Sequence, residues 1–133
     1  VPPDARFMGC DPAFALTIFD YTSRSVDMVH QQCQIAPMVR SQGPGWQFEN
    51  LITSAHTDCF TIDRLSVMQS ITHQKEDVLQ VGLVTQGDGV LDVDGVTIDV
   101  QVGDRFLVPA ATRELTISPS KEGLVMAICQ PLP

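Results

Sequence analysis

The segment QGDGVLDVDGVTIDVQVGDRFLVPA, residues 86–110, contains turn signals separated by short apolar stretches. Gly87-Asp88-Gly89 predicts a turn, Asp94-Gly95 predicts a two-residue hairpin, and Gly103-Asp104 predicts a further turn. Glycine supplies the positive φ that a chain reversal requires, and Pro109 marks the point where a strand leaves the sheet. This stretch therefore predicts an antiparallel β meander.

Further short strands are predicted on both sides of this segment. Upstream, Phe60 and Ile62, then Leu65 and Val67, alternate with polar residues, and the change of parity between the two pairs predicts a bulge or a strand break. The other predicted strands are residues 78–84, 90–93, 96–100, 105–108, 115–117 and 124–128. Strands at intervals of about 8 to 12 residues indicate a mainly β, antiparallel sandwich or barrel.

The first part of the chain carries a different pattern. Asp11-Pro12, followed by an apolar series up to Phe19, predicts a helix, because aspartate caps a helix start and proline suits its first position. Residues 24–46 show no sustained period, and residues 41–45 are rich in turn formers, which indicates an extended connecting segment. We therefore expect one structural domain, in which residues 1–56 form a helix and arm packing on a barrel of residues 57–133.

The charge balance limits the partners of this chain of 133 residues. Aspartate and glutamate outnumber lysine and arginine by 16 to 8, and the formal charge of −8 repels nucleic-acid phosphates and anionic membranes. No apolar run approaches the roughly 18 to 20 residues that span a bilayer, and the first residues lack a signal-peptide pattern. We expect a cytoplasmic protein that binds neither nucleic acid nor membrane. An anionic sugar phosphate would need locally placed arginine or lysine.

The glycine turns and the segment Gly103-Asp104-Arg105-Phe106-Leu107-Val108-Pro109-Ala110 together resemble the core of cupins, which are double-stranded β-helix or jelly-roll barrels. Within the cupins, the chain is similar to the carboxy-terminal cupin portion of class I mannose-6-phosphate isomerases, the type I phosphomannose isomerases. Residues 11–21 and 57–62 also carry this resemblance, which is weak between Arg24 and Asn50. It implies a cupin barrel with a short N-terminal helix and an extended arm.

The resemblance implies a role in carbohydrate metabolism. Family members are zinc-dependent isomerases that interconvert mannose 6-phosphate and fructose 6-phosphate, and their zinc ligands belong to an amino-terminal cupin ahead of the region matched here. This chain is then expected to hold no catalytic residue and no cofactor, and to partner the catalytic cupin half of the same protein. The absence of an initiator methionine before Val1 favours an excised piece or a processed product.

Metal-binding cupins place two histidines and a glutamate ahead of the first glycine turn, and a further histidine after the proline. By this family pattern, His73 and Lys75 take the two histidine positions, Gln80 takes the glutamate position, and Glu114 takes the last histidine position. A protonated lysine has no lone pair and a neutral glutamine is a weak ligand, so only His73 and Glu114 remain as metal ligands. Two donors do not make a tight metal site. His73 and Glu114 are therefore metal ligands only if the chain is an autonomous metal-binding cupin.

Two alternatives to the non-catalytic module stay open. One is a stand-alone, metal-dependent, sugar-modifying enzyme of the small cupin kind, which would use the two donors above together with His56. The other is a ligand-binding or dimerisation module, in which Phe106, Val108 and Leu124 enclose a small ligand or face a second copy of the chain.

The remaining polar and aromatic residues have ordinary interpretations. Arg105 is expected to pair with neighbouring aspartates rather than with a phosphate, and Trp46 with Phe48 is expected to plug the barrel under the arm. Carboxylates at turns and at outward strand positions are expected to form a solvated rim: Asp88, Asp92, Asp94, Asp99 and Asp104.

Overall fold

The computed structural model describes residues 9–132, which fall into two units, residues 9–34 and 35–132. The first unit contains two short helices, α1 (Pro12–Leu16) and α2 (Val26–Cys33). Asp11 caps α1 by accepting a hydrogen bond from the Ala13 amide at 3.2 Å, and Ser25 caps α2 in the same way. Both helices consist of exposed or half-buried residues.

The first helix begins where the sequence predicts it, but it is shorter than the apolar series up to Phe19 indicates. Helix α1 ends at Leu16 after five residues, and α2 lies in a segment that was predicted to be extended. The signals for α2 are local, because Ser25 caps the amino terminus while Asp27 and His30 suit the dipole at the first and last turns. An apolar period is not needed for such a short capped helix.

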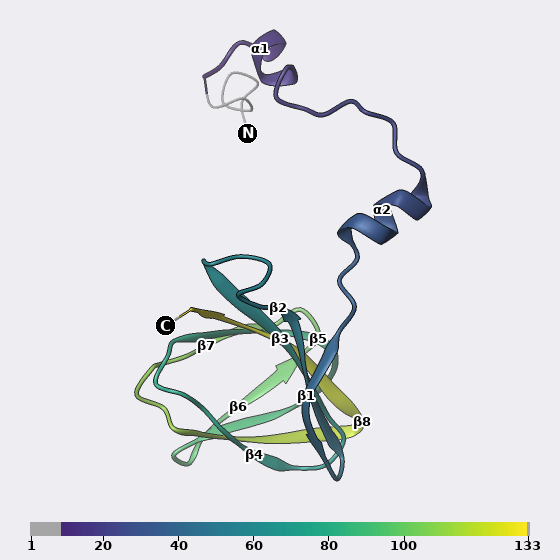
Figure 1. The fold of residues 1–133 in the computed structure, drawn as a ribbon. Coiled ribbons are helices and arrows are strands. Elements are labelled where there is room, and N and C mark those ends of the chain that lie inside the picture. The colour runs from purple at the N-terminus through teal and green to yellow at the C-terminus, as the bar shows by residue number, and fades with distance from the viewer. Residues whose placement is uncertain (1–8, 133) are drawn as a thin grey trace. The chain divides into compact units, whose positions relative to one another are not determined.

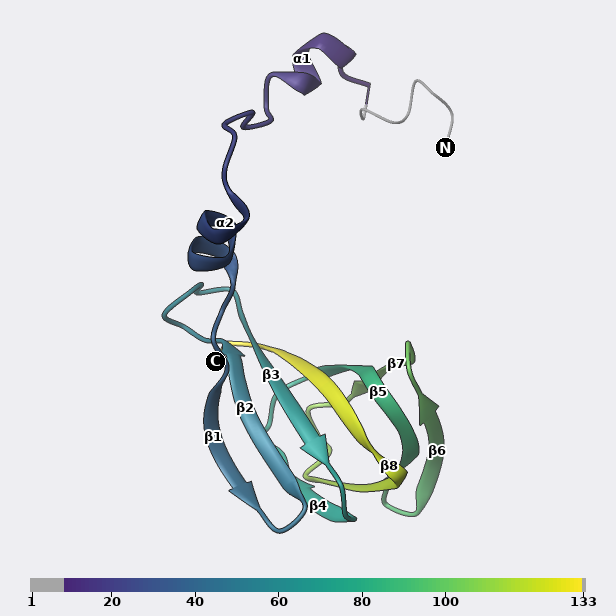
Figure 2. The ribbon, with the colours of Figure 1, turned by 90° about the vertical axis from the view of Figure 1, so that its right-hand side faces the viewer.

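Within residues 35–132, eight antiparallel strands form the second unit. Their bounds are β1 (Met38–Gly43), β2 (Trp46–Ile52), β3 (Phe60–Val67), β4 (Ile71–Gln74), β5 (Gln80–Val93), β6 (Val96–Gln101), β7 (Arg105–Val108) and β8 (Glu114–Pro131). The main strand order is β1-β2-β3-β8-β5-β6, with β4 paired to β8 and β7 paired to β5. Figure 1 shows the strands curving around a common interior, and Figure 2 shows β1, β2, β3 and β8 side by side.

Two long strands organise the barrel. The first part of β8 pairs with β4, and its last part pairs with β3. Strand β5 pairs with β8 over most of its length, while its two ends also pair with β7 and β6. The predicted mainly β antiparallel barrel is therefore present, although 115–117 and 124–128 belong to one strand instead of two.

The barrel sheet begins at Met38, earlier than the predicted start at residue 57. Strand β2 pairs with β3 from Trp46 opposite Val67 to Ile52 opposite Ile62, and β1 continues the sheet at its edge. Phe48 is the physical reason, because its buried side chain anchors β2 to the interior. Residues 38–52 thus belong to the sheet instead of to a separate arm.

The glycine-rich sequence in β5 forms a bulge, so the prediction of a turn there was wrong. The pairing of β5 with β8 shifts register between Val84 and Gln86 and again between Gly87 and Gly89, and the strand continues beyond both shifts. Gly87 has a φ of 72°, and a β carbon at this position would collide with the Gly123 carbonyl. The hairpin at Asp94-Gly95 is confirmed, with φ angles of 53° and 82° between β5 and β6.

Phe60 and Ile62 differ in parity from Leu65 and Val67 because the two pairs lie on opposite faces of one strand, β3. Strand β3 pairs with β8 in unbroken register, so the predicted bulge or break in β3 is wrong. Leu65 and Val67 are fully buried, whereas Phe60 and Ile62 have the opposite parity and lie on the outer face. The irregularity is on the neighbouring strand β2, where the register shifts between Asn50 and Ile52.

The apolar core fills much of the barrel interior. Val108 and Leu124 are at most 4% exposed, and Phe106 packs against the core while half-buried. These three residues therefore do not face a second copy, because their strand parity directs them inward. The fully buried members include Leu65, Val67, Ile117, Leu124 and Met126. Burying such side chains contributes about 1.5 to 3 kcal/mol each.

Candidate functional site

A pocket of about 370 Å³ opens into the barrel beside the apolar core. Strands β1, β2, β4, β5 and β8 contribute to its walls, with Trp46, Phe48 and Ile71 as an apolar side. Its polar lining includes Arg40, His73, Gln74, Lys75, Gln80 and Gln130. The expectation that Trp46 and Phe48 plug the barrel under an arm needs correction, because both side chains line this opening. The pocket contains three of the four positions that the resemblance assigns to metal ligands.

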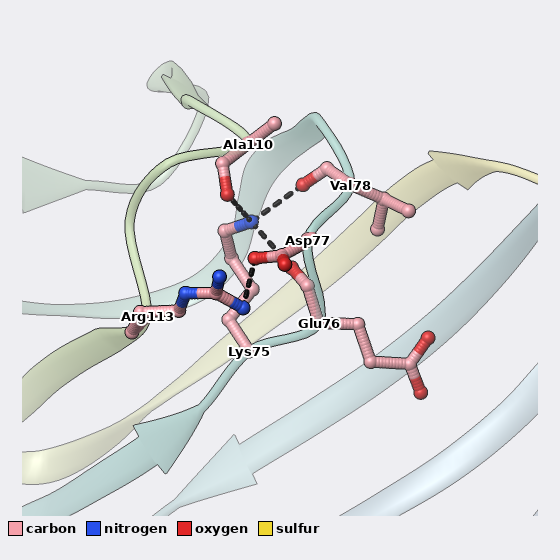
Figure 3. A network of polar contacts seen from close by, with 6 residues as sticks. All are labelled: Lys75, Glu76, Asp77, Val78, Ala110 and Arg113. Carbon is pink, nitrogen blue, oxygen red and sulfur yellow. Dashed lines mark hydrogen bonds and ion pairs between the residues drawn. The ribbon is translucent and has the colours of Figure 1, made fainter.

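Lys75 is the most constrained polar side chain of the pocket. Only 6% of the residue is exposed, and its Nζ donates to the backbone carbonyls of Glu76, Val78 and Ala110 (Figure 3). An ammonium group has three hydrogens, so these carbonyls use its whole donor capacity. Burial lowers the pKa of Lys75, although Asp77 partly opposes this change. Lys75 ties the loop after β4 to the loop after β7 and has no lone pair for a metal.

His73 lies in the pocket on the inward parity of β4. Its ring stacks on Phe48 with 5.6 Å between the ring centroids and an interplanar angle of 17°. Burial lowers the pKa of His73 below its usual 6.5, and the positive charges of Arg40 and Lys75 lower it further. The ring is therefore neutral at physiological pH. The polar residues around His73 in the sequence favour a solvated loop, but strand β4 places the ring inside the barrel.

Glu114 lies on the other face of the sheet from His73. Within the β4–β8 pair, His73 is opposite buried Leu115, whereas Glu114 is opposite Gln74. Exposed Glu114 accepts a hydrogen bond from Gln74 Nε2 at 2.9 Å. Strand alternation explains this placement, since Leu115 and Ile117 occupy the inward positions of β8 and leave Glu114 outward. The structure does not bring the two predicted metal ligands together.

Gln80 occupies the remaining ligand position and is bound by another amide. It is 5% exposed, and its Nε2 donates to Oε1 of Gln130 at 2.8 Å. This bond joins the start of β5 to the end of β8 across the barrel wall. The two amides keep further donor and acceptor capacity that a bound molecule could use.

Arg40 reaches the pocket from an irregular position in β1. The register of β1 against β2 shifts between Val39 and Ser41, so Arg40 is the extra residue of a bulge. Its guanidinium lies over the Phe48 ring at 5.6 Å from the centroid, and it is 3.7 Å from the Glu76 carboxylate. Bulges commonly redirect a side chain near a functional site. Both members of this ion pair are exposed, so the pair is weak.

Asp63 is a buried carboxyl group that the sequence analysis did not single out. It is 2% exposed and accepts a hydrogen bond from Asn50 Nδ2 at 2.6 Å. Burial raises the pKa of Asp63, while the Asn50 bond and the charges of Arg40 and His73 oppose that rise. Its parity was the available signal, because Asp63 shares the inward face of β3 with Leu65 and Val67.

The other histidines lie outside the pocket. His56 is exposed in the loop between β2 and β3, where its Nδ1 accepts a hydrogen bond from the Thr53 amide at 3.2 Å. His30 is exposed on α2. Among residues 9–132, no three histidine, cysteine or acidic side chains are grouped in a way that could hold a metal ion. The same residues include no helix long and apolar enough to cross a membrane.

The aspartates of the glycine-rich segment serve mainly as turn residues. Asp92 accepts from the Gly95 amide, Asp104 accepts from the Gln101 amide, and Asp88 accepts from the Ser120 hydroxyl. Arg105 is exposed at the start of β7 and forms no ion pair with a described residue, contrary to its expected pairing with aspartates. Two of these hydrogen bonds close local turns, and the third joins β5 to β8.

The jelly-roll barrel with a pocket open to its interior defines a cupin. The family model for the cupin domain of mannose-6-phosphate isomerase matches residues 50–127, which is more than half of the chain. The chain therefore belongs to the mannose-6-phosphate isomerase cupin domain family. No curated protein matches the sequence.

Several solved structures share the fold. Mannose 6-phosphate isomerase from Bacillus subtilis aligns with a TM-score of 0.60 and 16% identity, covering 88% of this chain and 33% of that chain. An RmlC-like cupin from Shewanella frigidimarina aligns with a TM-score of 0.57 and 18% identity, covering 85% and 91%. KdgF from a Halomonas species aligns with a TM-score of 0.56 and 23% identity, covering 71% and 86%. At these identities the likeness shows the cupin fold alone.

Proposed function

We propose that this chain is the carboxy-terminal, non-catalytic cupin module of a mannose-6-phosphate isomerase-like protein of carbohydrate metabolism. The proposal rests on the contacts of the side chains at the four positions where metal-binding cupins have their metal ligands. Lys75 is bound to three carbonyls, Gln80 is bound to Gln130, and Glu114 lies outside the barrel. Only His73 can donate to a metal, so the residues present do not fit the zinc site of the complete enzyme.

The matched lengths support a modular role. This chain corresponds to 33% of the Bacillus subtilis isomerase, so most of that enzyme has no counterpart here. The partner we propose is the catalytic cupin half of the same protein, which would carry the zinc. In that arrangement this barrel braces or completes the catalytic half.

A stand-alone cupin is the second candidate, and the pocket is the observation that favours it. The chain covers 91% of the RmlC-like cupin, so a barrel of this size also occurs as nearly a whole protein chain. The metal-dependent form of this candidate is weakened because His73 and Glu114 lie on opposite faces of the sheet. A ligand-binding form needs no metal and could use the pocket as it stands.

The proposal is tested by zinc content together with a coupled assay for mannose 6-phosphate isomerisation. We expect the purified chain, incubated with zinc and freed of excess metal, to retain far less than one zinc per chain and to show no turnover. His73→Ala serves as the matched control, because any zinc bound by the pocket would require this ring. About one zinc per chain with turnover, both lost in His73→Ala, would overturn the proposal in favour of a metal enzyme.

A further inference from the structure

One outer face of the barrel carries a continuous row of apolar side chains. The row crosses five neighbouring strands, β7, β5, β8, β3 and β2, and each of its residues lies directly opposite the next: Leu107, Val81, Cys129, Ile62 and Ile52. Inward-facing residues take the alternate positions of these strands, so the row points away from the barrel interior. Opposed β carbons lie about 5 Å apart, which makes the row one contiguous strip.

Much of this surface is open to solvent. Leu107 is 59% exposed and Val81 is 45% exposed, and Leu83, two residues further along β5, is 40% exposed. Exposed Phe60 extends the strip along β3. Single exposed apolar side chains are ordinary on a protein surface, whereas a contiguous apolar patch marks an interaction site. The row, together with Leu83 and Phe60, is called the apolar outer face below.

The other outer face of the barrel is polar. A row across β4, β8, β5 and β6 consists there of polar residues: Thr72, Thr116, Asp92 and Thr97. The Thr72 and Thr116 hydroxyl groups are hydrogen-bonded at 3.3 Å, and Gln74 donates to Glu114 beside them. An antiparallel sheet that packs one face on a core usually presents polar residues to water on its other face. The apolar outer face departs from this pattern, which indicates that another molecule covers it.

Opposite charges mark the two ends of the neighbouring row on the apolar outer face. This row runs beside the first across the same strands: Arg105, Leu83, Ala127, Arg64 and Glu49. Arg105 is exposed and forms no ion pair with any of residues 9–132. At the other end, Glu49 Oε2 accepts a hydrogen bond from Arg64 Nε at 2.6 Å, and a carboxylate can accept on both oxygens. The Arg64 hydrogen bond also lowers the pKa of Glu49 and so keeps its carboxylate charged.

A second copy of the chain fits this distribution of charge. If the two copies are related by a two-fold axis parallel to β8, their rows face each other in reverse order. Arg105 of each copy then lies opposite Glu49 of the other, and Val81 lies opposite Ile62. The same surface serves both copies, as closed two-fold symmetry requires. The polar outer face, which carries Asp92, stays away from the contact, and this limits the repulsion between two chains of formal charge −8.

The size of the apolar outer face fits a weak dimer. Five strands about 4.8 Å apart make it about 24 Å wide, and residues 125–131 of β8 make it about 23 Å long. Two such faces would bury about 1,100 Å² in total, near the low end of specific protein interfaces. We therefore expect a reversible dimer with a dissociation constant in the micromolar range.

We propose that two copies of this chain associate through the apolar outer face, with Arg105 of each copy paired to Glu49 of the other. The inference does not rest on the proposed function, because it concerns only the outside of the barrel. It uses neither the pocket nor the positions of the metal ligands.

Sedimentation velocity of the full chain tests the association. Between about 1 and 500 µM we expect a concentration-dependent equilibrium of monomer and dimer. A reducing agent is present throughout, because the four cysteines are free and disulfide-linked dimers must be avoided.

A lysine in the middle of the row locates the interface. Val81→Lys should weaken the dimer at least about tenfold, because an ammonium group would lose its hydration inside the contact. Val96→Lys on β6 is the matched control, since Val96 is 65% exposed and lies outside the apolar outer face. Urea unfolding of both variants shows that each is folded.

Charge reversal tests the proposed ion pair. Arg105→Glu should weaken the dimer about tenfold, because the new carboxylate would lie opposite the Glu49 carboxylate of the other copy. Lys121→Glu makes the same change in net charge at an exposed position outside the row and should leave the dimer unchanged.

Cys129 reports whether the face is covered. It lies in the middle of the row, so a second copy would shield its thiol. We expect its alkylation by a maleimide to slow as the chain concentration rises, whereas exposed Cys33 on α2 should keep its rate. Peptide mass spectrometry measures both rates.

A chain that stays monomeric at about 500 µM would overturn the proposal and leave the apolar outer face to a different partner, such as a catalytic cupin half. A dimer that Val81→Lys leaves intact would also overturn it, since the copies would then associate through another surface. Equal weakening by Arg105→Glu and Lys121→Glu would attribute the effect to net charge and remove the pairing of Arg105 with Glu49.

Discussion

The barrel interior contains an apolar core and a polar pocket, and the same two long strands contribute to both. Strand β5 places Gln80 in the pocket and Leu91 in the core, while β8 places Ile117 in the core and Gln130 in the pocket. Strand alternation sends all four side chains inward, so only their chemistry separates the two regions. Core residues stabilise the fold through burial of apolar surface alone. Polar side chains that point inward need hydrogen-bond partners to offset the hydration that they lose. The difference shows that the polar side chains of the pocket depend on hydrogen-bond partners, as Gln80 does on Gln130, whereas the core side chains do not.

The largest expected effect is in the apolar core. Leu124→Ala should lower the free energy of unfolding by about 3 kcal/mol, because it removes buried methyl groups and leaves a cavity at a fully buried position. Leu107→Ala on the outer face of β7 is the control, since Leu107 is 59% exposed and should cost less than about 1 kcal/mol. Urea unfolding measures both. Equal losses at the two positions would contradict the assignment of the core.

A smaller loss is expected when the pocket loses its buried ammonium. Lys75→Met keeps the side-chain length but leaves the carbonyls of Glu76, Val78 and Ala110 without their donor, which should cost about 1 to 2 kcal/mol. Exposed Lys121 provides the control, and Lys121→Met should be nearly neutral. If urea unfolding gave the two methionine variants the same stability, Lys75 would make no net contribution through its hydrogen bonds.

The smallest effect is a pH dependence from His73. Its pKa is lowered in the folded barrel by burial, Arg40 and Lys75, with Asp63 opposing them, whereas the unfolded chain keeps the usual value of 6.5. As the pH falls through 6.5 the unfolded state takes up a proton first, so stability should fall until the pH is below the folded pKa. The free energy of unfolding, measured between about pH 7.5 and 5.5, gives the slope of stability against pH.

His73→Gln should flatten the slope, and His56→Gln should leave it unchanged because His56 is exposed. Asp63 acts in the opposite sense, because burial raises its pKa in the folded barrel and stability is lost as the pH rises through its titration. If the free energy of unfolding changed with pH as steeply in His73→Gln as in the wild type, the pH dependence would belong to another group.

Local turn chemistry made much of the barrel predictable from sequence. Asp94-Gly95 and Gly103-Asp104 forced chain reversals at positions where few other residues could follow the backbone. Gly87 carried the same positive-φ signal, yet here the glycine serves a bulge, and sequence does not distinguish a bulge from a turn. The edge strand β1 was missed because its residues are almost all exposed and show no alternation.

The pocket was predictable only in part. Counting by family spacing found His73, Lys75 and Gln80, which do line the pocket. The same counting placed Glu114 with them, although alternation from Leu115 would have set it outside. Arg40 gave no signal, because a bulge breaks the alternation that would have revealed its direction.

The position of β8 in the chain sets a limit on how the protein is made. Strand β8 pairs with β3, β4 and β5, and it follows all of them along the chain. A nascent polypeptide on the ribosome therefore carries β3 and β5 with exposed edges until residues 114–131 have emerged. Closure of the barrel waits until residues 114–131 have left the ribosome, and during that interval the unprotected strand edges are where a chaperone would be needed most.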